Sequence, residues 1–140
     1  MKSETAKELL RFIKHCPGSF HTVKTVTDLL TEDGYTKLSE SAPWPLRSGG
    51  KYFVTRNHSS VIAFRIPHRD FSAFLMTASH SESPAFKIKP DPEMPVKNYY
   101  VKLNTEKYGG MLYTTWMDRP LSVAGRIVVK TADGIETRLV

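Results

Sequence analysis

The segment ASHSESP, residues 78–84, places an imidazole and a carboxylate two positions apart. Side chains alternate along an extended chain, so His80 and Glu82 would share one face, with the neighbouring serines on the other. Two residues span about 6.6 Å of strand, which lets both groups approach one metal site. A carboxylate commonly orients a ligating imidazole through its other ring nitrogen. The spacing therefore suggests His80 as a metal ligand and Glu82 as the group that orients it.

A His after a strand is usually a surface loop residue or a satisfied polar group, so an ordinary loop also explains these residues. A zinc site needs three or four ligands, and this segment offers one imidazole and one carboxylate. The sequence contains no H-E-x-x-H, no G-x-S-x-G and no P-loop that would carry chemistry by itself. From the residues alone, metal ligation and an ordinary turn both remain open.

Two further residues, Asp118 and His21, are of types that can carry chemistry. Asp118, in TTWMDRP, is an acid beside an aromatic residue and could be catalytic, but Asp and Pro favour a turn there. His21 follows Ser19-Phe20 near a helix start, where packing or capping is the simpler interpretation. The sequence assigns neither residue a role.

The elements that would position His80 follow from hydrophobic periodicity. The run FSAFLMTAS, residues 71–79, is almost entirely apolar and predicts a central strand covered on both faces. His80 would then lie at its carboxyl end, where the sites of open α/β sheets gather. KYFVTR and SVIAFRI flank Asn57-His58-Ser59, which predicts a hairpin.

Helices are predicted before this region and strands after it. Apolar residues at helical spacing predict helices over residues 3–16 and from a Ser19 cap to Gly34. KPDPEMP, with three prolines, predicts a linker. The segments YYVKLNT, MLYTTW, SVAGRIVVK and IETRLV then predict strands, so the first part is α/β and the second all-β.

Composition limits the class of protein. The chain has 140 residues and one cysteine, Cys16, which excludes an internal disulfide framework and a C-x-x-C metal site. The net charge is +6, but the 20 Lys and Arg residues are scattered, so we expect no nucleic-acid partner. A polar N-terminus and the lack of a long apolar stretch predict a cytoplasmic protein without a membrane partner. The positive charge could attract acidic substrates.

Four segments together resemble a known family. KELLRFIKHCPGSFHTV, GGKYFVTRNHSSVIAF, TASHSESPAFKIKP and YGGMLYTTWMDRPLSVAGRIVV are similar, in this order, to the N-terminal part of the aspartyl aminopeptidases. The resemblance covers nearly the whole chain.

The resemblance implies a fold, a cofactor and partners. It implies the first part of a zinc-aminopeptidase-type three-layer α/β/α catalytic domain at residues 1–90. Residues 91–140 would begin an inserted, β-rich dimerisation domain. Family members use two zinc ions per site to activate water, remove acidic N-terminal residues from peptides, and assemble into homo-oligomers. The family motif His-Thr-Asp-Ser-Pro or His-Ser-Asp-Ser-Pro maps onto His80 as a zinc ligand and Glu82 as its supporting acid.

Two departures from the family limit what this chain is expected to do. Glu82 replaces the family's Asp, which moves the carboxylate by roughly 1.5 Å where about 0.5 Å matters. By this mapping the other ligands and the general base lie beyond Val140. We therefore expect a truncated metalloaminopeptidase for peptides with N-terminal Asp or Glu, inactive as an isolated chain. The alternative is an inactive remnant that acts as an interaction or oligomerisation module.

Overall fold

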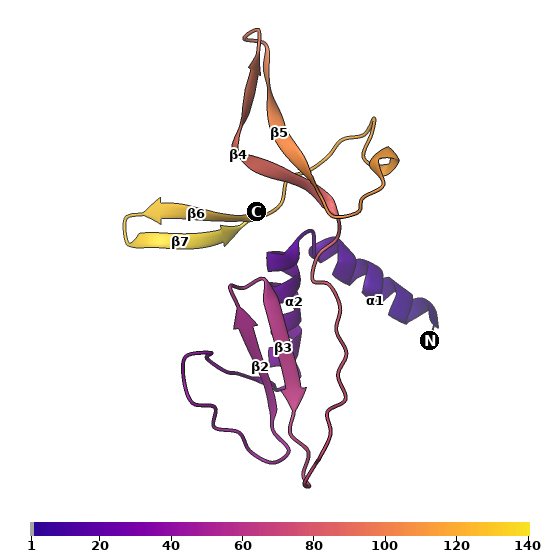
Figure 1. Cartoon of the computed structure of the whole chain (residues 1–140), viewed down its shortest axis with the longest axis vertical. Coiled ribbons are helices and arrows are strands. Elements are labelled where there is room, and N and C mark those ends of the chain that lie inside the picture. The colour runs from indigo at the N-terminus through magenta and orange to yellow at the C-terminus, as the bar shows by residue number, and fades with distance from the viewer. Residues whose placement is uncertain (1) are drawn as a thin grey trace. The chain divides into compact units, whose positions relative to one another are not determined.

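A computed structural model describes residues 2–140, with side chains from Glu4 onward. The chain divides into two compact units, one of residues 1–82 together with 123–140, and one of residues 83–122. Figure 1 labels helices α1 and α2 and strands β2 to β7.

The first unit is α/β. Its helices are α1 (Lys2–His15) and α2 (Ser19–Glu32). Strands β1 (Thr36–Lys37), β2 (Lys51–Arg56) and β3 (Ser60–Arg65) form one sheet in the order β1-β2-β3. Strand β1 is parallel to β2, and β2 is antiparallel to β3. Helix α2 packs against β2 and β3 (Figure 1).

A separate hairpin completes the first unit. It consists of β6 (Arg126–Thr131) and β7 (Gly134–Leu139), which pair antiparallel. Beyond the strand register, Gly125 and Val140 exchange two backbone hydrogen bonds of 2.9 and 3.0 Å, which close the open end of the hairpin.

The core of the first unit centres on β2. Tyr52 and Val54 point to one face of the sheet and form a buried cluster with Leu38. Phe53 points to the other face and is 2% exposed, as is Val23 on α2. The alternation along β2 therefore buries both faces of this short strand.

The loop between β1 and β2 is fastened to the sheet by aromatic side chains. The ring of Trp44 stacks on Phe64 with centroids 5.8 Å apart, and its indole nitrogen donates to the Ser39 carbonyl at 2.8 Å. The hydroxyl of Tyr52 accepts a hydrogen bond from the Arg47 amide at 2.9 Å. These contacts hold a loop that contains two prolines and a glycine pair.

The Tyr52 hydroxyl is expected to contribute to the stability of the fold. We expect Tyr52→Phe to lower the free energy of unfolding by about 0.5–1.5 kcal/mol, because the half-buried Arg47 amide loses its partner. Urea denaturation of the two chains measures the difference. Tyr100→Phe is the matched control, since Tyr100 is 57% exposed, and it should change stability by less than about 0.5 kcal/mol. Equal effects at the two tyrosines would contradict this role of the hydroxyl.

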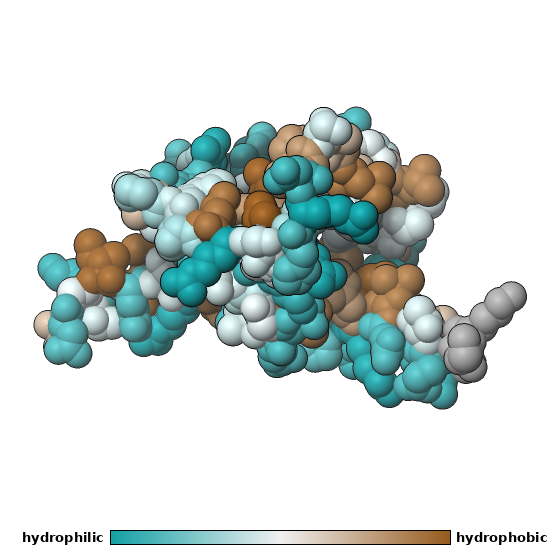
Figure 2. All heavy atoms as spheres, turned by 90° about the horizontal axis from the view of Figure 1, so that it is seen from below, coloured by the Kyte–Doolittle hydropathy of each residue, from teal (hydrophilic) through white to brown (hydrophobic). Residues whose placement is uncertain are grey.

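The second unit is a long hairpin followed by a short helix. Strands β4 (Ala85–Val96) and β5 (Tyr100–Tyr108) pair antiparallel, with a register shift between Ile88 and Glu93. A 3-10 helix, η1 (Tyr113–Thr115), follows. Phe86 packs edge-on against Trp116 with ring centroids 5.5 Å apart. Many large hydrophobic side chains remain exposed, including Tyr99 at 86%, and Figure 2 shows brown hydrophobic areas on the face that it draws.

Four sequence predictions of local structure are wrong. FSAFLMTAS, residues 71–79, is neither a strand nor covered, because no strand among the described residues pairs with it; Leu75 is 101% exposed. KPDPEMP is part of β4 rather than a linker: Pro90 and Pro92 fall at the register shift of a two-stranded sheet, and Pro95 lies opposite Val101 on β5. MLYTTW forms η1, not a strand. Ser19 is the first residue of α2, whose cap position is Gly18, without a side-chain hydrogen bond.

The remaining local predictions are confirmed. The hairpin turns at residues 57–59, and Asn57 and His58 both have positive φ, which suits a tight turn. Gly34, with φ of 80°, lies just after α2, and Asp33 and Gly34 return amide hydrogen bonds to Leu29 and Thr31. None of the helices in residues 2–140 combines the length and hydrophobicity that a membrane span requires.

Candidate metal centre

His80 lies in a segment of irregular structure that leaves the end of β3 and returns to the β2–β3 turn. At its start, the Ser48 hydroxyl donates to the Pro67 carbonyl at 3.2 Å. At its end, the Ser81 hydroxyl donates to the Ser59 carbonyl at 3.1 Å. Residues 71–80 are exposed throughout, so the imidazole of His80 is accessible to a ligand.

Glu82 is exposed as well, and the half-buried Ser81 lies between it and His80. Residues 2–140 contain no cluster of three or more His, Cys, Asp or Glu side chains that could hold a metal ion. A zinc site needs three or four ligands. The described residues therefore supply one exposed imidazole, His80, and one carboxylate two positions further along the chain, Glu82. These groups suit zinc, but a complete zinc site needs further ligands.

The β2–β3 turn supports this segment, and an arginine that sequence analysis did not single out supports the turn. The guanidinium of Arg126, at the start of β6, donates to the Asn57 carbonyl at 3.0 Å and to its side-chain oxygen at 3.3 Å. The same guanidinium lies 4.1 Å from the centroid of the Phe20 ring. No sequence motif marks this contact, because Arg126 and Asn57 are 69 positions apart.

The two other candidate residues lie elsewhere. His21, on α2, is half-buried, and its Nδ1 is a buried ring nitrogen without a hydrogen-bond partner in the described part of the chain. Asp118 lies in a turn after η1 with φ of 52°, so the turn predicted there is confirmed. Neither residue joins a group of potential ligands within residues 2–140.

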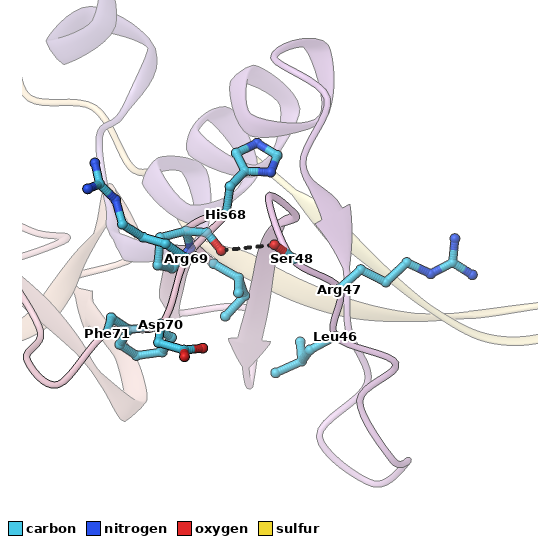
Figure 3. A pocket seen from close by; sticks show the side chains of 9 residues that line it. Leu46, Arg47, Ser48, His68, Arg69, Asp70 and Phe71 are labelled. Atoms are coloured by element: carbon cyan, nitrogen blue, oxygen red, sulfur yellow. Dashed lines mark hydrogen bonds between the residues drawn. The ribbon is translucent and has the colours of Figure 1, made fainter.

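A surface hollow of about 550 Å³ opens near the start of the segment (Figure 3). Its lining includes Arg47, His68 and Arg69. Figure 3 shows the guanidinium groups of the two arginines pointing away from each other, so they do not converge on one anion. The His68 ring lies against Gly49, whose φ of 76° and lack of a Cβ make room for it.

The fold is shared with solved peptidase-family structures. The chain superimposes with a TM-score of 0.89 on a structure described as the Ape4 and Nbr1 complex, at 36% identity over 96% of this chain and 26% of that chain. A second match is the S. cerevisiae mApe1 dodecamer, with a TM-score of 0.81 and 28% identity over 97% of this chain and 33% of that chain.

The family assigned from the sequence agrees with this structural similarity. The profile of the aminopeptidase I zinc metalloproteases (M18) matches residues 12–140, and the chain belongs to this family. A probable M18 family aminopeptidase 2 from Clostridium acetobutylicum is 44% identical over 140 residues, which are 97% of this chain and 32% of that protein. The chain therefore spans about a third of the length of the curated relatives that it matches.

Proposed function

We propose that this chain is the N-terminal part of a cytoplasmic zinc aminopeptidase, in which His80 binds one of two zinc ions and Glu82 orients the His80 ring. The family match carries the proposal, because it covers residues 12–140 and so includes both residues. The exposed position of His80 supports it, since a ligand imidazole must be reachable.

His80 and Glu82 would have different roles at the metal. One ring nitrogen of His80 would bind zinc, and the N–H of the other would donate a hydrogen bond to the Glu82 carboxylate, which would fix the tautomer and the ring orientation. Zinc, when bound, polarises a carbonyl oxygen and lowers the pKa of a bound water. The remaining ligands and a general base would come from protein outside residues 2–140.

The substrate class that we propose is peptides with an N-terminal Asp or Glu. The chain carries a net charge of +6, and a positive field raises the local concentration of acidic substrates. The resemblance of its four segments to the aspartyl aminopeptidases points to the same class.

The domain arrangement is also part of the proposal. Residues 1–90 would begin the catalytic domain and residues 91–140 an inserted dimerisation domain of a homo-oligomer. Exposed hydrophobic side chains on β5 support an assembly role, among them Tyr100 at 57% and Leu103 at 49%. A related protein, mApe1 of S. cerevisiae, is described as a dodecamer.

An assay of the full-length protein tests this function. We expect it to release the N-terminal residue of Asp and Glu peptides at least about tenfold faster than that of a matched Leu peptide, a difference of about 1.4 kcal/mol. A chelator should abolish the activity, and added zinc should restore it. Faster cleavage of the Leu peptide would overturn the substrate class, and full activity in chelator would overturn the metal.

A second candidate function is a non-catalytic interaction module. The apolar surface of β4 and β5 favours it, because an isolated two-stranded hairpin is marginally stable in water and gains stability when covered. This candidate predicts association that does not depend on zinc, together with no peptidase activity in the full-length protein.

A further inference from the structure

Arg126 is half-buried at the start of β6, and its guanidinium contacts two other parts of the first unit. It donates to two oxygens of Asn57, at 3.0 and 3.3 Å, while its guanidinium stacks over the Phe20 ring at 4.1 Å. Charge-assisted hydrogen bonds are stronger than neutral ones, and a cation over an aromatic ring within about 6 Å is attracted to it. One side chain thereby joins β6, α2 and the β2–β3 turn.

The turn that Arg126 contacts contains two residues in an unfavourable backbone conformation. Asn57 and His58 have φ values of 52° and 56°, in the left-handed region. Asn and His are enriched in this region among non-glycine residues, but any L-residue adopts it at some cost in free energy. Hydrogen bonds to both the carbonyl and the side chain of Asn57 favour this conformation over others that the turn could adopt.

The β2–β3 turn also holds the segment that carries His80. The Ser59 amide donates to the Arg56 carbonyl at 3.1 Å, which closes the turn. The Ser59 carbonyl then accepts the hydrogen bond from the Ser81 hydroxyl at 3.1 Å. Because Ser81 lies directly between His80 and Glu82, the position of the turn carbonyl sets the position of the backbone that joins these two residues.

We propose that Arg126 is a positioning residue for the His80–Glu82 segment and acts through the β2–β3 turn and Ser81. The inference rests on the proposed function, in which His80 binds zinc. In this proposal Arg126 acts on the segment through Asn57 and not by binding the metal or the substrate itself. Its effect is to hold the turn in the conformation whose Ser59 carbonyl receives Ser81.

The test uses the full-length protein and two measurements, zinc retention against a competing chelator and the separate values of kcat and KM. Substitution of groups that orient metal ligands typically costs 10–100-fold in metal affinity or activity. We expect Arg126→Gln to lower zinc affinity and kcat by about tenfold, with KM unchanged, and Ser81→Ala to do the same. Arg126→Lys, which keeps the charge and one donor, should lie between Arg126→Gln and the unmodified protein.

A double substitution separates this path from a general loss of stability. If Arg126 acts through Ser81, Arg126→Gln combined with Ser81→Ala should be no worse than the more severe single variant, because coupled residues are non-additive. Arg138→Gln is the control, since it removes the same charge from β7 of the same hairpin, where Arg138 pairs with Glu136. It should leave zinc affinity and kcat unchanged.

Three results would overturn the inference: fully additive losses in the double variant, an equal loss in Arg138→Gln, or unchanged zinc affinity and kcat in Arg126→Gln. Failure of the proposed function looks different. In that case His80→Ala itself would leave zinc affinity unchanged, whereas failure of this inference alone would leave the effect of His80→Ala intact.

Discussion

Replacing His80 with alanine is expected to lower the zinc affinity of the full-length protein by more than about 100-fold, and its peptidase activity at least as much. The expectation exceeds the 10–100-fold loss typical of groups that only orient a ligand, because the substitution removes a ligand outright. Zinc retained after dialysis against a chelator, measured together with the release of N-terminal Asp, gives both quantities.

Substitutions around His80 sharpen this prediction. Glu82→Gln keeps the shape but loses the charge, so we expect a 10–100-fold loss. Glu82→Asp restores the acid usual in the family motif and should retain zinc at least as well as the unmodified protein. His15→Ala is the control, since His15 is exposed at the end of α1 and its ring contacts the Arg11 carbonyl at 2.7 Å. Equal zinc affinity in the His15 and His80 variants would contradict the assignment of His80.

Replacing Phe53 with alanine is expected to lower the free energy of unfolding of the 140-residue chain by about 3–5 kcal/mol, the usual cost of truncating a buried Phe. Phe53 is the largest fully buried side chain among the described residues, at the centre of the three-stranded sheet. A loss of this size is a large fraction of the stability of a small domain. Urea denaturation followed by circular dichroism measures it.

The control lies on the neighbouring strand. Ile62 on β3 is 67% exposed, so Ile62→Ala should cost less than about 0.5 kcal/mol. A loss below about 1 kcal/mol at Phe53 would show that the core lies elsewhere.

Elements that local chemistry determines were predicted correctly from the sequence. The β2–β3 hairpin follows from two apolar runs around Asn57 and His58, residues that lie in the left-handed conformation of the turn. The two helices follow from apolar residues at helical spacing. In each case the residues that decide the structure are neighbours in the chain.

Elements that depend on a distant partner were not predicted. Residues 71–79 have the composition of a central strand, yet a strand exists only through hydrogen bonds to another, and composition does not supply that partner. KPDPEMP shows the opposite error. Its prolines suggested a linker, but both strands of a two-stranded sheet are edge strands, which accommodate two of the prolines at a register shift and the third in a paired position.

The candidate site shows the same division. His80 and Glu82 can be singled out from their types and spacing at the end of an apolar run. Arg126 could not be singled out, because its contacts with Phe20 and Asn57 are long-range and no local pattern encodes them.

Arg56 and Glu40 form an ion pair on the surface. The hydrogen bond and charge of Glu40 raise the pKa of the Arg56 guanidinium above its usual value.

A crystal structure of the full-length protein with zinc, with data collected at the zinc absorption edge, tests directly whether His80 is a zinc ligand. We expect an anomalous peak about 2.0–2.1 Å from one ring nitrogen of His80, with the Glu82 carboxylate at hydrogen-bond distance from the other ring nitrogen. Zinc bound at full occupancy by other residues, with the His80 ring outside its coordination sphere, would contradict this expectation.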